Sequence, residues 1–209
     1  MKKLFAIFAG LFIGLAAFAQ SAEEILARME KVMEPSSQSE AIVMTMEMKI
    51  PILGTMGTRV FTYGDKSKMV IEAAGKEGVT WMDHKSRTSW TYMKEKNTVT
   101  IENMKPDQKS DSDDAEMFKG VAEGYDVSIR KETSDRWYIA CKKSKTNKDK
   151  DDPKNMEIVV AKGTYMPISL SAKASGVTMT MKDIDFNVTE ADVTFNPADF
   201  PGVTIEDKR

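Results

Sequence analysis

The sequence predicts a mainly β protein with some α structure: an antiparallel sheet of about eleven strands that curls and is covered by two or three helices. Three observations predict it. Short runs in which apolar and polar residues alternate at every second position recur along the chain, and turn residues separate them at close intervals. Helical spacing occurs only near the start and in one interruption of the strand pattern. No composition shift or repeat divides the chain, so residues 20–209 are expected to form one domain.

The first segment is typical of a secretory signal. Lys2 and Lys3 precede an apolar run, residues 4–18, that ends in the small-residue motif Ala17-Phe18-Ala19. The run is shorter than the ~20 residues that a membrane span needs. We expect cleavage after Ala19, export, and a product that is free in solution because residue 20 is Gln and not a lipid-bearing Cys.

One amphipathic helix opens the expected domain. Ser21 and Glu24 form a capping box, in which the hydroxyl and the carboxylate satisfy free backbone donors at a helix start. Apolar residues then recur at helical spacing up to Met33. Pro35 ends the helix, because the residue before a proline is disfavoured in the helical region.

The strand pattern begins after this helix. Apolar residues alternate from Ile42 to Ile50, and residues 54–57, with a glycine at each end, are expected to form the turn that follows. Residues 106–124 interrupt the pattern with a charged start and a short helical pattern, which predicts a helical insert over the sheet. The eleven expected strands are 42–50, 59–63, 68–73, 79–83, 88–93, 98–103, 125–131, 137–143, 156–162, 168–173 and 177–186.

The expected helices are too short to cover the apolar face of so large a sheet, so a partly unfilled apolar concavity is expected. The chain has 16 methionines, and several of them lie on apolar strand faces. Methionine side chains are unbranched and adapt to ligands of different shapes. The alternative, that these methionines fill an ordinary core, stays open at this point.

Composition excludes several function classes. A net charge of −2 with mixed signs argues against a nucleic-acid partner. With one His and one Cys in the chain, we expect no catalytic residues, no metal site, no cofactor and no enzyme activity. Asp111, Asp113 and Asp114 fit a helix start better than a calcium loop, and no phosphate-binding G-x-x-x-x-G-K-[ST] motif is present. Cys141 cannot form an internal disulfide, and it is either a buried apolar residue or an exposed thiol.

The ending of the chain resembles a known family. Residues 192–209, DVTFNPADFPGVTIEDKR, are similar to the C-terminus of LolA-family periplasmic lipoprotein carriers, which end in an F-x-F-x-P…G-V-x-V-x-D pattern. Residues 156–170 resemble the long hairpin of that family, and residues 79–92 resemble its strand pair around a D-G-x-x-x-W-x-Y-like run. The resemblance extends over nearly the whole chain after the signal.

The resemblance implies an incomplete barrel with helices as a lid over an apolar cavity that takes acyl chains. It implies a carrier that passes lipoproteins between membranes, with an inner-membrane loading complex and an outer-membrane acceptor as partners, and we expect a monomer. One departure concerns the lid. LolA proteins carry an arginine after the second strand that bonds to the lid, whereas this chain has Lys66 in the corresponding region.

The candidate site therefore consists of apolar residues alone. The expected lid residues are Met117, Phe118 and Val121. The residues expected to line the cavity are Met44, Met46, Met48, Phe61, Met69, Ile71, Trp81, Trp90, Phe118, Leu170, Met179 and Met181.

Two other functions remain alternatives. The same fold could serve as a lipid-sensing or lipoprotein-sensing binding module of the cell envelope, or as an exported structural component with a filled core. An enzyme acting on lipids is disfavoured, because no nucleophile has a base at a recognisable spacing.

Overall fold

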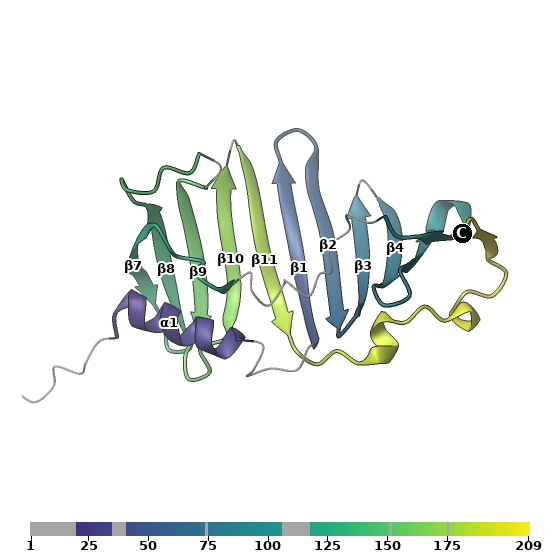
Figure 1. The fold of residues 1–209 in the computed structure, drawn as a ribbon. Helices are drawn as coiled ribbons and strands as arrows, with labels where there is room; N and C mark the ends of the chain where they lie inside the picture. Colours follow the sequence, from purple (N-terminus) through teal and green to yellow (C-terminus); the bar gives the residue numbers. More distant parts are fainter. Residues whose placement is uncertain (1–19, 35–40, 74, 106–117, 151, 175) are drawn as a thin grey trace, which may run out of the picture.

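The computed structural model describes residues 20–34, 41–73, 75–105, 118–150, 152–174 and 176–209. They form one sheet of 12 strands, with a single α-helix lying across one face (Figure 1). The expected signal, residues 1–19, lies outside the described residues. The helices and strands are α1 (Ala22–Met33), β1 (Ala41–Ile50), β2 (Gly54–Tyr63), β3 (Lys66–Ala73), β4 (Lys76–Asp83), β5 (Thr88–Met93), η2 (Lys94–Lys96), β6 (Thr98–Asn103), β7 (Tyr125–Glu132), β8 (Arg136–Lys143), β9 (Asn155–Ala161), β10 (Pro167–Ala174), β11 (Val177–Asp185), η4 (Glu190–Val193), η5 (Pro197–Asp199) and β12 (Thr204–Asp207).

The sheet is open and does not close into a barrel. Its strand order is β12-β6-β5-β4-β3-β2-β1-β11-β10-β9-β8-β7, so β12 and β7 are the two edges. Neighbouring strands are antiparallel except for the parallel pair of β12 and β6. The pairing of β1 with β11 joins the run β1–β6 to the run β7–β11. The prediction of a mainly β fold with an unclosed antiparallel sheet is confirmed.

The expected bounds of helix α1 and the hydroxyl half of its expected capping box are confirmed. The hydroxyl of Ser21 accepts a hydrogen bond from the backbone N–H of Glu24 at 3.2 Å, and the helix ends at Met33. Ile25 and Met29 are among its buried residues, because the apolar stripe of the helix faces the sheet. We call the sheet face that carries α1 the inner face.

The main core lies between α1 and the inner face. Direct cross-strand partners share a face, so Met181, Leu170, Ile158 and Ile139 form one apolar row across β11, β10, β9 and β8. Ile158 and Ile139 are fully buried in the cluster that contains the apolar stripe of α1. The helix therefore covers the end of the sheet formed by β7–β11, and no other α-helix of the described residues lies over the inner face near β1 and β2 (Figure 1).

The opposite, outer face is covered by the segment that follows β11. Val188 and Val193 pack against Ala41 and Val43 of β1 in a second core cluster. The Lys66 ammonium lies 2.6 Å from the Glu190 carboxylate in the same segment. Lys66 thus binds the C-terminal segment on the outer face.

Three expectations need correction. The turn after β1 is formed by residues 51–53, and residues 54–57 belong to strand β2. A twelfth strand, β12, was not predicted. Among the described residues there is one α-helix, with three short 3-10 helices, in place of two or three covering helices. Residues 106–117 of the expected helical insert lie outside the described residues. None of the described helices is long and apolar enough to span a membrane.

Candidate functional site: an apolar groove on the inner face

The inner face of the sheet contains an apolar groove of about 400 Å³. It lies beside the α1 core and shares Val60 and Met181 with that core. Five strands contribute to its walls, because β3, β2, β1, β11 and β10 are consecutive in the sheet. Its lining residues are Met46, Glu47, Met48, Met56, Thr58, Val60, Met69, Leu170, Ala172, Met179, Thr180 and Met181.

Cross-strand register explains why methionines gather in this groove. Met46 pairs with Met181, and Met48 pairs with both Met179 and Met56. Met48 is 38% exposed and Met179 is 53% exposed, so these side chains do not form a closed core. The groove thus offers thioether side chains that can rearrange around an apolar guest.

Six of the expected lining residues lie together around the groove: Met46, Met48, Met69, Leu170, Met179 and Met181. Met44 belongs to the same face but is buried in the α1 core. Ile71 is exposed and is not among the lining residues.

Phe61, Trp81 and Trp90 lie on the outer face, away from the groove. Phe61 packs in the cluster of Val188 and Val193. The ring of Trp81 lies 5.3 Å from that of Phe195, and Trp90 stacks on the same phenylalanine at 6.1 Å. These three aromatic residues hold the C-terminal segment, because strand alternation directs them to the face opposite the methionines.

The described part of the expected lid packs against α1. Phe118 is buried in the α1 core, and Val121 is half-buried against it. Burial raises the pKa of the Glu30 carboxyl on α1, although the backbone of Gly120 partly offsets this shift through a hydrogen bond. Met117 lies outside the described residues. Phe118 therefore contributes to the core beside the groove and is not a lining residue.

Sequence reasoning missed three apolar lining residues, Met56, Val60 and Ala172. Met56 was assigned to a turn because glycines flank it. Val60 and Ala172 follow the same alternation as their neighbours on β2 and β10, so the period-2 pattern contained the signal for both.

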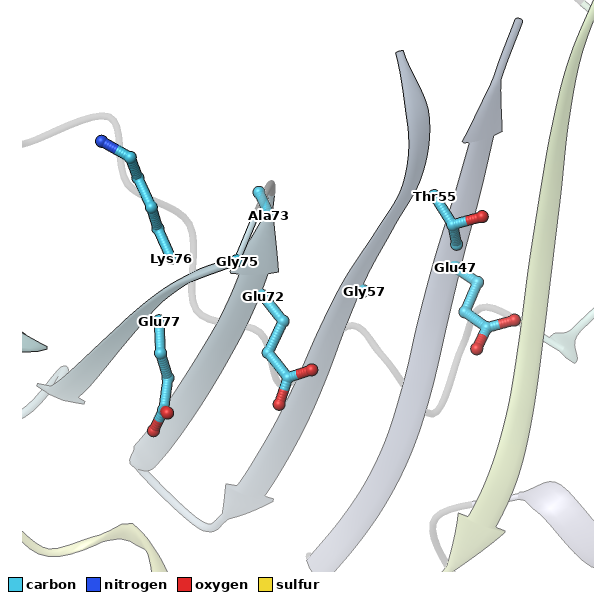
Figure 2. Close-up of a pocket in the computed structure, with 8 residues that line it drawn as sticks. All are labelled: Glu47, Thr55, Gly57, Glu72, Ala73, Gly75, Lys76 and Glu77. Carbon is cyan, nitrogen blue, oxygen red and sulfur yellow. The ribbon is translucent and has the colours of Figure 1, made fainter. Parts of the chain in front are cut away.

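A second hollow, of about 370 Å³, lies near the β3–β4 turn and is polar. Figure 2 shows the carboxylates of Glu72 and Glu77 on the neighbouring strands β3 and β4, and that of Glu47 on β1 beyond the intervening strand β2. Glu47 pairs with Lys182 at 2.8 Å, and Glu77 pairs with Lys94 at 2.8 Å. Within the described residues, no cluster of His, Cys, Asp or Glu could hold a metal ion. We interpret this hollow as a solvated charged surface.

Cys141 is a buried residue of the inner-face core, 1% exposed. Burial raises the pKa of its thiol from 9.0 to about 11. We therefore expect the folded protein to resist a thiol-alkylating reagent at pH 8 and to react once it is unfolded in urea.

The same shift affects stability. The folded state holds the thiol proton more tightly than the unfolded state, so the free energy of unfolding should decrease as the pH rises from about 9 to about 11. Urea unfolding of the unmodified protein and of Cys141→Ala across this pH range would measure the decrease in the free energy of unfolding, which the alanine variant should lack.

The alkylation experiment tests the burial of Cys141 directly. Equal alkylation rates with and without urea would contradict that burial.

Comparisons with known proteins give similar solved structures but no match to a family. No protein-family model matches the chain, and no curated protein matches it significantly. An uncharacterized conserved protein from Thermus thermophilus is 16% identical, with 90% of this chain and 99% of that chain covered and a TM-score of 0.44. The lipoprotein LppX of Mycobacterium tuberculosis is 10% identical, with 83% and 100% covered and a TM-score of 0.46.

A LolA superfamily protein from Nitrosomonas europaea is 12% identical, with 86% of this chain and 100% of that chain covered and a TM-score of 0.34. These low scores mean that a function for this chain has to be argued from its own groove. The similar solved structures do include a LolA superfamily protein, from the family that the ending of the sequence resembles.

Proposed function

We propose that the protein is a periplasmic carrier that binds the acyl chains of lipoproteins in the inner-face groove and passes them between membranes. The observation that carries this proposal is the groove itself: an apolar space of about 400 Å³ in which Met46, Met48, Met56 and Met179 are only partly buried. Its volume falls in the range of small-molecule binding sites, roughly 300–1,000 Å³.

The free energy of acyl-chain burial suits a carrier. Each methylene group moved from water into an apolar site contributes about 0.8 kcal/mol, so a sixteen-carbon chain gains up to about 12 kcal/mol if it is fully buried. Ordering of the chain and partial exposure in an open groove reduce this gain. Such a chain leaves into water slowly, but it can pass to an acceptor that contacts the open side of the groove.

Hand-off through partners is part of the proposal. We propose an inner-membrane complex that loads the groove and an outer-membrane acceptor that empties it, without nucleotide hydrolysis by this chain. The resemblance of residues 192–209 to the ending of LolA-family carriers supports lipoprotein as the cargo. The signal-like residues 1–19, with cleavage after Ala19, support export of a one-domain product, which we propose acts as a monomer.

Native mass spectrometry tests the binding step. We expect gently purified protein to carry a lipid, or to take up a synthetic acylated peptide with one peptide per protein. The same peptide without its acyl chains is the control and should not bind. Ligand-free protein that takes up neither peptide would overturn the proposal.

Transfer between vesicles tests the carrier step. Donor vesicles that contain a self-quenched acylated peptide are mixed with acceptor vesicles, and loss of quenching reports transfer. We expect a rate that rises with protein concentration. A protein that binds the peptide but leaves the transfer rate unchanged would instead fit the sensing module.

A further inference from the structure

The turn between β1 and β2 carries the most exposed large apolar side chains among the described residues. Ile52 is fully exposed, and Leu53 is 76% exposed. The turn projects from the end of the sheet (Figure 1). Exposed apolar residues are common singly, but two adjacent ones on a projecting turn indicate a contact surface.

The backbone of this turn shows that stability does not explain its sequence. Ile52 has a φ of 74°, in the left-handed region that β-branched residues rarely adopt. Glycine or asparagine would adopt this conformation at lower cost. A strained isoleucine that buries nothing within the protein is therefore a candidate for contact with something outside it.

Lysines without acidic partners lie beside the turn. Lys49 and Lys173 both pair with Thr178 in the strand register, so they share one row across β1, β11 and β10. Both are exposed, and neither forms an ion pair within the described residues. The β10–β11 turn is close to the β1–β2 turn, since a Cβ added at Gly176 would lie 4.0 Å from Cγ of Pro51.

The wall of the groove reaches the same end of the sheet. Met48 precedes the turn on β1, Met56 follows it on β2, and the two residues are direct cross-strand partners in the groove wall. The apolar tip therefore continues the groove wall of the inner face, while Lys49 and Lys173, each one residue out of phase with a groove residue, lie on the outer face at the same end of the sheet. Apolar side chains at the headgroup boundary and lysines near anionic headgroups are the features that bind proteins to membrane surfaces.

We propose that this end of the sheet docks on an anionic phospholipid bilayer, with Ile52 and Leu53 entering the boundary between headgroups and acyl chains. Lys49 and Lys173 contact the lipid phosphates. The proposal rests on the carrier function and deepens it, because docking places the groove against the bilayer. An acyl chain can then enter or leave the groove without crossing water.

Vesicle flotation tests the docking. The purified protein is mixed with vesicles of phosphatidylcholine, with or without one third phosphatidylglycerol. We expect binding to the vesicles that contain phosphatidylglycerol. The double variant Ile52→Asn/Leu53→Asn should lower the partition coefficient about tenfold or more, and it should fold because asparagine tolerates the left-handed conformation at position 52. Lys49→Gln/Lys173→Gln should lower it about tenfold on the same vesicles.

A matched control separates the tip from exposed apolar residues in general. Ile205 on the edge strand β12 is also exposed, and Ile205→Asn should leave flotation unchanged. Vesicle binding by Ile52→Asn/Leu53→Asn equal to that of the unmodified protein would overturn the proposal. So would an absence of binding to anionic vesicles, the result expected if the tip instead docks on a protein.

Binding of a fluorescent fatty acid in the absence of vesicles keeps the two proposals apart. We expect the tip variant to bind it as tightly as the unmodified protein does. Fatty-acid binding without vesicle docking would overturn the docking proposal and leave the carrier function intact. Vesicle docking without fatty-acid binding would overturn the carrier function.

Discussion

Replacement of Met179 by aspartate is expected to lower the affinity for a sixteen-carbon fatty acid about a hundredfold. Met179 lines the groove and is 53% exposed, so the charged side chain remains solvated in the empty protein and the fold is maintained. A bound chain would have to desolvate the new carboxylate or leave that part of the groove. Exclusion of about four methylene groups, at about 0.8 kcal/mol each, accounts for a loss of this size. Titration with a fluorescent fatty acid measures it.

Met93 provides the matched control for this experiment. Met93 is a partly exposed methionine like the groove residues Met48 and Met179. It lies on β5 and is not among the residues that line the groove. Met93→Asp adds the same charge to the protein outside the groove, so its affinity for the fatty acid should stay within about twofold of the unmodified value. Equal losses for Met179→Asp and Met93→Asp would place the binding site elsewhere or attribute the effect to net charge.

The period-2 pattern was sufficient to predict the strands, because it depends only on which residues are apolar. Strands β5 and β6 have the predicted bounds, and most others differ by a few residues at their ends. The turn after β1 was misplaced because Gly54 and Gly57 are typical turn residues. The actual turn contains Ile52, which local propensity disfavours there. The register of β1 with β2 determines the turn, and this register is a tertiary property.

Assignment of strand faces was the harder part of the site prediction. Alternation shows that Met44 and Val43 lie on opposite faces, but it does not show what covers each face. Both residues are buried, Met44 under α1 and Val43 under the C-terminal segment. In a sheet that is covered on both faces, the odd-numbered and the even-numbered positions of a strand can therefore both be apolar. Alternation alone does not tell which of the two sets of residues faces the groove, so the aromatic residues of the outer face are predicted to line the same cavity as the methionines.

Strand β12 could not be predicted from its own residues. All four of its residues are exposed, and it is held by parallel pairing with β6, about a hundred residues earlier in the chain. The carbonyl of Asn97 accepts a hydrogen bond from the backbone N–H of Thr204 at 3.0 Å, where this pairing begins. The family resemblance identified the ending of the chain, but the pairing partner of a short exposed strand follows only from the folded sheet.

Replacement of Trp81 by alanine is expected to lower the free energy of unfolding by about 3–5 kcal/mol, the range for loss of a buried aromatic side chain. Trp81 is 6% exposed, and its ring makes edge contacts with both Phe195 and Phe200. Its loss would leave a cavity under the C-terminal segment and remove two of the aromatic contacts that hold that segment on the outer face. Urea unfolding measures the effect, and Trp81→Phe should recover part of the stability because it keeps a ring in contact.

The same variant distinguishes the two faces of the sheet. If Trp81 lined the acyl site, as the sequence first indicated, Trp81→Ala would weaken binding of the fluorescent fatty acid even where the protein is fully folded. Because Trp81 lies on the outer face, we expect fatty-acid affinity within about twofold of the unmodified value under native conditions, despite the large loss of stability. A fall in affinity approaching that of Met179→Asp would mean that the outer face takes part in binding, and a two-sided site would then replace the inner-face groove.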